Sequence, residues 1–309
     1  MRALVTGGSG FIGGRLLSRL LDDGHEVTAL IRGEPAGRLD PRAKAARIDA
    51  PASLANIVAY AAPDVVFHVA SAVVIEHSPE AIADIVQANV TFPTQLLDAM
   101  ARNGVNRFVN TGTSWQHHDG GVLYLASNLY AASKQAFEDI AAFYNDAHGI
   151  GVANLKLFDV YGPSDPRSKI IPLLLRVLRH GDPLSMSLGE QVLDMVHVDD
   201  VVEAYLAAAT WLKDNPGEQA TFAVRSGESY RLKDIVAVFE EVAGVALPIQ
   251  WGGRPYRDRE VMTPWVNDTP VPGWQAHVSL REGLAGVLEA HRLGMLADQV
   301  STAQHPVHP

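Results

Sequence analysis

Tyr130 and Lys134 stand four positions apart, a spacing at which two side chains can share acid–base chemistry. On a helix, residues i and i+4 project from the same face, so the lysine ammonium group would lie beside the tyrosine hydroxyl. A neighbouring positive charge lowers the pKa of a phenol toward working pH, where it can give up and take back a proton. Taken alone, the pair is also consistent with two surface residues, because this spacing is common by chance.

Hydroxyl groups that could work with this pair lie shortly before it in the chain. The apolar run 105–111 predicts a buried strand that delivers Thr111, Thr113 and Ser114 at its carboxyl end, and Thr113 precedes Tyr130 by 17 residues. Ligands of open α/β sheets bind outside the carboxyl ends of the strands. The hydroxyls and the Tyr130–Lys134 pair together therefore predict a reaction site.

A glycine-rich turn at residues 6–13, TGGSGFIG, lies between an apolar run at 2–5 and a segment with helical apolar spacing at 15–21. The glycines permit a sharp turn, a close approach to a pyrophosphate, and close packing of helix on strand, and the free N–H groups of the helix start face the anion. The alternative is a tight turn of any α/β protein. We predict dinucleotide contacts from Gly7, Gly10, Phe11, Ile12 and Gly13.

The second predicted strand, residues 26–31, ends in Arg32 and carries no carboxylate where the adenosine ribose would lie. An acidic residue there accepts from the 2′-hydroxyl of NAD, whereas an arginine pairs with the 2′-phosphate of NADP. Arg32, helped by Arg38, therefore favours NADP(H), with NAD(H) as the alternative and a solvated loop arginine as the non-functional interpretation. A third short strand at 47–49 brings Asp49 to a position where it could accept from the adenine amino group.

Two polar residues interrupt apolar segments near the predicted cofactor. His68 lies within the buried strand 63–71, where a hydrogen-bonded core histidine is expected rather than a ligand. Asn89 lies within a helix spanning about 79–100 and is either an anchor at a helix kink or a surface residue, the anchor being our preference. The small residues Ala70 and Ser71 would let the cofactor cross the strand end closely.

Composition limits the alternatives. The 309 residues are 47% hydrophobic and 19% charged, carry a formal net charge of −10 and contain no cysteine. Thiol chemistry and disulfides are excluded, and nucleic acids or anionic membranes are disfavoured partners. No apolar run of about 20 residues could span a bilayer, and a strand starting at residue 2 leaves no room for a signal peptide, so we expect a cytoplasmic protein. We expect no metal site, because adjacent histidines such as His117 and His118 point apart.

Together these motifs resemble the extended short-chain dehydrogenase/reductases of the nucleotide-sugar epimerase/dehydratase type. The resemblance runs from about Arg2 to Glu289. It rests on TGGSGFIG, HVAS at 68–71, TGTS at 111–114, YAASK at 130–134, VYGP at 160–163 and HVDDV at 197–201. It implies that Thr113 is the hydroxyl partner, Tyr130 the acid/base, and Lys134 its activator and ribose anchor. It also adds Val160 to the cofactor site.

The predicted fold is α/β, a doubly wound parallel (Rossmann) sheet of roughly seven strands with a smaller C-terminal annex. We expect residues 1–163 to form mainly the dinucleotide-binding domain. Residues 164–297 form mainly the substrate-binding region, with strands returning to the main sheet. Residues 298–309 are predicted to be a disordered tail. The family resemblance further implies a homodimer through helices near residues 84–101 and 130–147.

Within the family, LFDVYGPSDPRSKIIP at 157–172 and GGRPYRDRE at 252–260 look most like NADPH-dependent 4-ketoreductases of the CDP-abequose or CDP-paratose synthase kind. Dehydratases of the family carry an Asp-Glu pair after the threonine, and Ser114 with Trp115 in its place argues against 4,6-dehydration. His117 replaces a usual tyrosine, so one wall of the pocket differs from that of the family. Leu193 replaces an arginine that often holds the substrate diphosphate.

The substrate-binding residues implied by this resemblance start with Arg257, which matches a second family arginine, and Asp159, which stands where relatives often carry an asparagine. Arg231 and Arg254 are expected to help hold the diphosphate, with a solvated surface charge as the alternative for each arginine, and Ser114 to line the sugar site.

The predicted reaction is reduction of a nucleotide-diphosphate-linked 4-keto-deoxysugar by NADPH. Two alternative functions remain. One is a redox-neutral 4-epimerase with bound NAD, which would use the same Thr113–Tyr130–Lys134 set. The other is a non-catalytic NADP-sensing protein.

Overall fold

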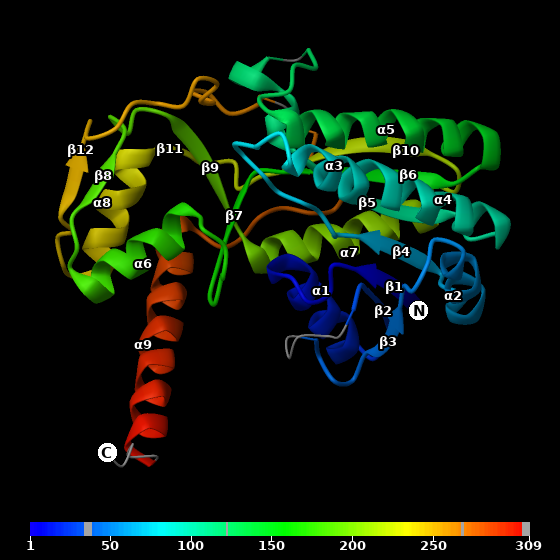
Figure 1. Ribbon diagram of the computed structural model, residues 1–309, viewed down its shortest axis with the longest axis horizontal. Coiled ribbons are helices and arrows are strands. Elements are labelled where there is room, and N and C mark those ends of the chain that lie inside the picture. Colours follow the sequence, from blue (N-terminus) through cyan, green and yellow to red (C-terminus); the bar gives the residue numbers. More distant parts are fainter. Residues whose placement is uncertain (34–38, 122, 267–268, 305–309) are drawn as a thin grey trace.

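The computed structural model describes residues 1–33, 39–121, 123–266 and 269–304, so Arg38, His305 and His308 lie outside the described residues. A parallel seven-stranded sheet forms its centre, in the order β10-β6-β5-β4-β1-β2-β3 (Figure 1). The strands are β1 (Arg2–Thr6), β2 (Glu26–Ile31), β3 (Lys44–Arg47), β4 (Val65–His68), β5 (Arg107–Thr113), β6 (Gly151–Leu157) and β10 (Gln219–Val224). This confirms the predicted doubly wound fold. The strand order reverses between β1 and β4, and the space above such a reversal is where ligands bind.

Helices cover both faces of this sheet because successive strand residues point to opposite sides. On β1, Val5 faces a core shared with α1 (Phe11–Asp22) and α7 (Val198–Asp214). Its neighbour Leu4 faces the other core, which is built with α2 (Ser53–Ala61), α4 (Phe92–Arg102) and α5 (Leu129–His148). The predicted third strand at 47–49 instead begins at Lys44 and ends at Arg47. The single helix expected at 79–100 is divided into α3 (Ala81–Val86), a π-helical turn at Gln87–Thr91, and α4.

A second body of structure packs around a third core. Its strands form a three-stranded sheet, β11-β9-β7, and a two-stranded one, β12-β8. These are β7 (Asp159–Tyr161), β8 (Leu184–Met186), β9 (Val192–His197), β11 (Ser229–Arg231) and β12 (Ile249–Trp251), packed with α6 (Ile170–His180), α8 (Leu232–Ala243) and α9 (Leu280–Gln304). The helix α9 extends away from the other elements (Figure 1) and continues past residue 298, from which the sequence predicts a disordered tail. None of the described helices is long and apolar enough to cross a membrane.

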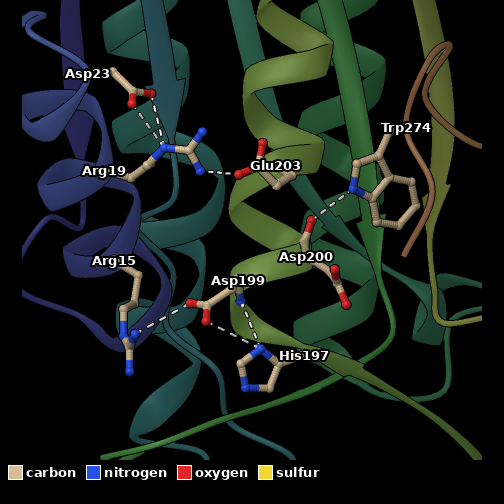
Figure 2. A network of polar contacts seen from close by, with 8 residues as sticks. All are labelled: Arg15, Arg19, Asp23, His197, Asp199, Asp200, Glu203 and Trp274. Carbon is tan, nitrogen blue, oxygen red and sulfur yellow. Dashed lines mark hydrogen bonds and ion pairs between the residues drawn. The ribbon is translucent and has the colours of Figure 1, made fainter. Parts of the chain in front are cut away.

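Charged side chains join α1, which follows the glycine turn, to α7 (Figure 2). Arg15 lies 3.4 Å from Asp199, and Arg19 pairs with Glu203 and with Asp23. These pairs are half-exposed and contribute little stability each. Figure 2 also shows that His197 caps α7, its Nδ1 accepting from the backbone N–H of Asp199 at 3.3 Å.

Candidate active site

The glycine turn between β1 and α1 has the shape that an anion site requires. Gly7 has φ +72°, and a Cβ atom there would lie 2.8 Å from the backbone nitrogen of Ala70. At Gly13 a Cβ would lie 2.2 Å from the carbonyl oxygen of Gly7, so the helix start and the strand end touch only because both residues are glycines. The N-cap, Gly10, supplies no side chain to the first N–H groups of α1. Those donors fit a dinucleotide pyrophosphate.

A cavity opens at the carboxyl ends of the strands, beside the glycine turn. It brings together seven of the predicted site residues: Ile12, Ser71, Thr111, Thr113, Tyr130, Asp159 and Val160. Ala70 packs against Gly7, and the ring of Phe11 lies under the guanidinium of Arg167 at 4.6 Å. The predicted hydroxyl partner and acid/base thus share one cavity.

Tyr130 is buried, and its hydroxyl shares the cavity with the side chains of Ser71 and Thr113, whose polar groups favour the ionised phenol. Burial raises the pKa of Tyr130 to about 12, and these polar groups and the charge of Arg167 offset only part of that rise. The Tyr–Lys spacing predicts the opposite direction. That prediction is wrong for the protein alone, because the loss of hydration on burial outweighs the charge of Arg167 and raises the pKa of Tyr130.

Lys134 lies on the same face of α5 as Tyr130, and its side chain is fully buried. Its Nζ has no hydrogen-bond partner among the described residues. Desolvation lowers the pKa of Lys134 to about 8. A buried ammonium group without a partner is unusual and indicates a ligand that supplies the missing acceptors. The residues therefore fit a dinucleotide whose ribose hydroxyls meet Lys134.

Asn89 is buried in the π-helical turn and anchors the surroundings of Tyr130, which confirms the kink-anchor prediction. Its Oδ1 accepts from Ser71 Oγ at 3.0 Å and from the N–H of Ala72 at 2.9 Å. Its Nδ2 donates to Ser133 Oγ at 3.0 Å and to the Ala72 carbonyl at 3.0 Å. The Ser71 hydroxyl donates its hydrogen bond to Asn89, so the Ser71 oxygen can accept one.

His68 is fully buried, as predicted, but only one of its ring nitrogens has a partner within the part of the chain that the structure describes. Thr6 Oγ1 accepts from the N–H groups of Val69 and Ala70, so its own proton goes to His68 Nδ1 at 3.0 Å. The neutral ring therefore carries its proton on Nε2. Desolvation and the charge of Lys134 hold the pKa of His68 well below its usual value.

The chain turns sharply after Thr113 into a short 3-10 helix, Ser114–Gln116. Ser114 is buried in this turn and Trp115 lines the cavity, with Lys169 Nζ 4.7 Å from its ring centroid. His117 stacks flat on Trp265 at 4.3 Å. It fills the place of the usual tyrosine as part of a buried stack.

A second pocket of about 580 Å³ shares Val73, Arg167 and Lys169 with the first. Arg254 and Arg257 complete its basic lining, and Arg257 lies 3.3 Å from Glu76. Arg231 is not part of this group. It pairs with Asp234 at 2.7 Å and lines neither of these two pockets.

Sequence reasoning missed Arg167 and Lys169. Both stand in the SDPRSK segment that follows VYGP, so the signal was their closeness to a motif already recognised. Arg167 donates to the Val160 carbonyl at 2.8 Å and to Asp165 at 2.7 Å, which fixes its guanidinium at the pocket edge. Lys169 lies 3.8 Å from Asp159. Burial raises the pKa of Asp159, and the charges of Lys169, Arg167 and Arg257 oppose that rise.

The residues predicted to contact the adenosine follow the strands β2 and β3. Arg32 is exposed directly after β2. Asp49 is exposed after β3 and pairs with Arg47 at 3.0 Å. Arg32 is thus accessible to a phosphate, whereas Asp49 already has a charged neighbour.

A model of the NAD dependent epimerase/dehydratase family matches residues 3–222. The chain belongs to this family. It is 28% identical to the CDP-abequose synthase of Salmonella typhimurium over 295 residues, covering 93% of this chain and 97% of that protein. It is 26% identical to a UDP-glucose 4-epimerase of Corynebacterium glutamicum, covering 81% and 83%.

Among solved structures, MoeE5 in complex with UDP-glucuronic acid and NAD superposes with a TM-score of 0.83 at 27% identity, covering 95% of this chain and all of that one. The family match and these relatives show an oxidoreductase-type enzyme of nucleotide-sugar metabolism with a nucleotide cofactor.

Proposed function

We propose that this family member reduces the 4-keto group of a nucleotide-diphosphate-linked deoxysugar with NADPH. The observation that carries the proposal is that two pockets share part of their lining. The cavity holding Thr113 and Tyr130 shares Arg167 and Lys169 with a pocket that Arg254 and Arg257 also line. A sugar carbonyl can therefore meet the acid/base pair while its diphosphate meets the cations.

The reduction needs a proton at the carbonyl oxygen, and Tyr130 is placed to give it. The raised pKa of Tyr130 keeps its hydroxyl protonated at neutral pH. The Thr113 hydroxyl lines the same cavity as Tyr130 and is placed to stabilise the negative charge that develops on the oxygen. The ammonium group of Lys134 favours the tyrosinate left after transfer. A bound reduced nicotinamide supplies the hydride to the carbon.

The four cations of the second pocket suit a substrate diphosphate. Arginine binds phosphate oxygens in a bidentate manner, and a lysine adds a point charge. With a formal net charge of −10 on the chain, a local cationic cluster is required to hold an anionic substrate. Leu193 leaves the usual clamp arginine missing, and Arg167 and Lys169 supply replacement charge.

Two further features favour reduction. No carboxyl group follows Thr113, where Ser114 and Trp115 stand, so the acid and base for dehydration are missing. Arg32 is exposed at the end of β2, where the 2′-phosphate of NADP would lie. A net reductase must draw its cofactor from a reduced pool, which is the reason that an NADP preference supports this reaction.

The second candidate is a 4-epimerase that keeps NAD bound. The similarity to UDP-glucose 4-epimerases and to MoeE5, solved with NAD, favours it. An epimerase returns the hydride to the same sugar and consumes no cofactor.

The test is incubation of the purified protein with NADPH and a panel of nucleotide-linked 4-keto-deoxysugars, followed by mass spectrometry. We expect a gain of two mass units in one sugar and matching loss of NADPH absorbance. Conversion of a UDP-hexose without cofactor consumption, together with NAD released on denaturation, would overturn the proposal in favour of the epimerase. Tyr130→Phe should abolish turnover and retain NADPH binding, whereas unchanged turnover would show that Tyr130 is not the acid.

We propose a homodimer through α3 and α5 as part of this function. Ile82 and Val86 on α3 and Phe143 on α5 are exposed apolar side chains on neighbouring helices. Light scattering on the purified protein tests this. A mass of one chain at micromolar concentration would contradict it.

A further inference from the structure

We propose that Glu138 is a positioning residue that holds Thr113 and the charge of Lys134 in place through one buried network. This inference rests on the proposed roles of Thr113 and Lys134. Glu138 follows Tyr130 and Lys134 at the same four-residue spacing on α5, so all three side chains lie along one face of that helix. All three are buried.

The network reaches Thr113 through Gln116. Glu138 Oε1 accepts from Gln116 Nε2 at 2.9 Å, and Gln116 Oε1 accepts from the backbone N–H of Thr113 at 2.9 Å. Gln116 and Glu138 also pack tightly against the backbone of β5 at Gly112. A Cβ at Gly112 would lie 2.8 Å from Gln116 Oε1 and 2.9 Å from Glu138 Oε1. The carboxylate thus fixes the end of β5 that carries Thr113.

The other oxygen of Glu138 faces a buried cation on the neighbouring strand. Lys156 Nζ, on β6, lies 3.6 Å from Glu138 Oε2 and 2.9 Å from His117 Nε2, over the ring of Trp265 at 5.2 Å. Burial raises the pKa of Glu138, and Lys156 is the largest charge that opposes the rise. Lys156 therefore favours the charged form of this carboxyl group, against the effect of burial.

That negative charge acts on Lys134. Burial lowers the pKa of Lys134, and Glu138 is the group that opposes this lowering. His68, from β4, faces Lys134 as well, and it is held neutral by burial. Lys134 has no hydrogen-bond partner among the described residues, so the carboxylate one turn away is its source of stabilising charge.

The titration of Lys134 can be measured without any substrate. The chain has six lysines, so carbon-13 labelling of lysine gives a small set of Cε signals whose shifts follow deprotonation. In Glu138→Gln we expect the Lys134 midpoint to move to lower pH than in the wild type. Asp139→Asn removes an exposed carboxylate from the adjacent position and should leave that midpoint unchanged. Equal midpoints in all three proteins would overturn the proposal.

The Thr113 branch is tested by turnover. Gln116→Met removes the link to the Thr113 N–H and keeps Glu138, so we expect kcat to fall about tenfold, KM to change little, and the Lys134 midpoint to stay in place. Unchanged kcat would refute this branch. Should Glu138→Gln fail to fold, Glu138→Leu replaces it, because it removes the same charge, and the same downward shift is expected. A wild type without 4-ketoreductase activity would refute the proposed function but leave the lysine titration as a valid test.

Discussion

Gly13→Ala tests the glycine turn, because the added methyl group has no space. Its carbon would lie 2.2 Å from the Gly7 carbonyl oxygen and 2.7 Å from the carbonyl carbon, about 1 Å short of ordinary contact. Both atoms belong to the backbone, so the start of α1 must move away from the strand. Overpacking of this kind costs about 1–3 kcal/mol, partly offset by about 1 kcal/mol for alanine over glycine in a helix.

The same displacement moves the N–H groups of α1 away from the pyrophosphate. A hydrogen bond to a charged group contributes about 1.5–3 kcal/mol, so loss of one raises the Kd for NADPH about tenfold or more. We expect Tm, measured by thermal unfolding without ligand, to fall by roughly 2–4 °C. The Kd would be measured by fluorescence titration.

Gly14→Ala is the matched control, since it adds the same methyl group one residue later in the same helix. Its Cβ would lie 3.3 Å from the Gly8 carbonyl oxygen, which requires a shift of only a few tenths of an ångström. We expect its Tm and NADPH affinity to stay near wild-type values. If Gly13→Ala matched this control in both measurements, the glycine turn would not be the cofactor site.

Three further predictions follow from the charged residues. Arg32→Asp should raise the Kd for NADPH at least tenfold and change that for NADH little, because a phosphate contact is lost; a wild type that prefers NADH contradicts this. Arg257→Ala should raise the substrate KM about tenfold. Arg231→Ala should leave KM unchanged, because the Arg231 side chain pairs with Asp234 and lies outside the pocket. Equal effects of the two substitutions would show that the pocket does not bind the diphosphate. Lys134→Met should unfold at a higher Tm than the wild type at pH 7. Burial lowers the pKa of Lys134 from 10.5 to about 8, so between pH 8 and pH 10.5 the unfolded chain binds a proton that the folded chain does not. The stability of the wild type therefore rises with pH in this range, and the difference in Tm between the two proteins closes. A gap independent of pH would refute that reasoning.

Local patterns predicted the elements and much of the acid–base set. The glycine spacing at 7, 10 and 13 and the tyrosine–lysine spacing on α5 each lie within one contiguous segment, where chain geometry fixes what faces what. Strand and helix periodicity likewise predicted a doubly wound parallel sheet, and this is confirmed. Boundaries were less accurate. β3 starts at Lys44, where alanine and charged residues give little strand signal and pairing with β2 decides the structure.

Which charges converge could not be read from the sequence. Arg167 and Arg257 are 90 positions apart, and packing brings them to one pocket. Arg231 does not line that pocket and pairs with Asp234. The contacts at the start of α7 also depend on packing. Asp199 turns toward Arg15 on α1, and His197 occupies the capping position (Figure 2).

Spacing along the chain is enough to predict a dinucleotide turn ahead of a threonine–tyrosine–lysine set. The electrostatics of these residues depend on the packed fold. It buries Tyr130 and Lys134 together, raising the pKa of one and lowering that of the other, and places Glu138 and Gln116 behind them. Desolvation depends on what covers a side chain from every direction, and that information exists only in the packed fold.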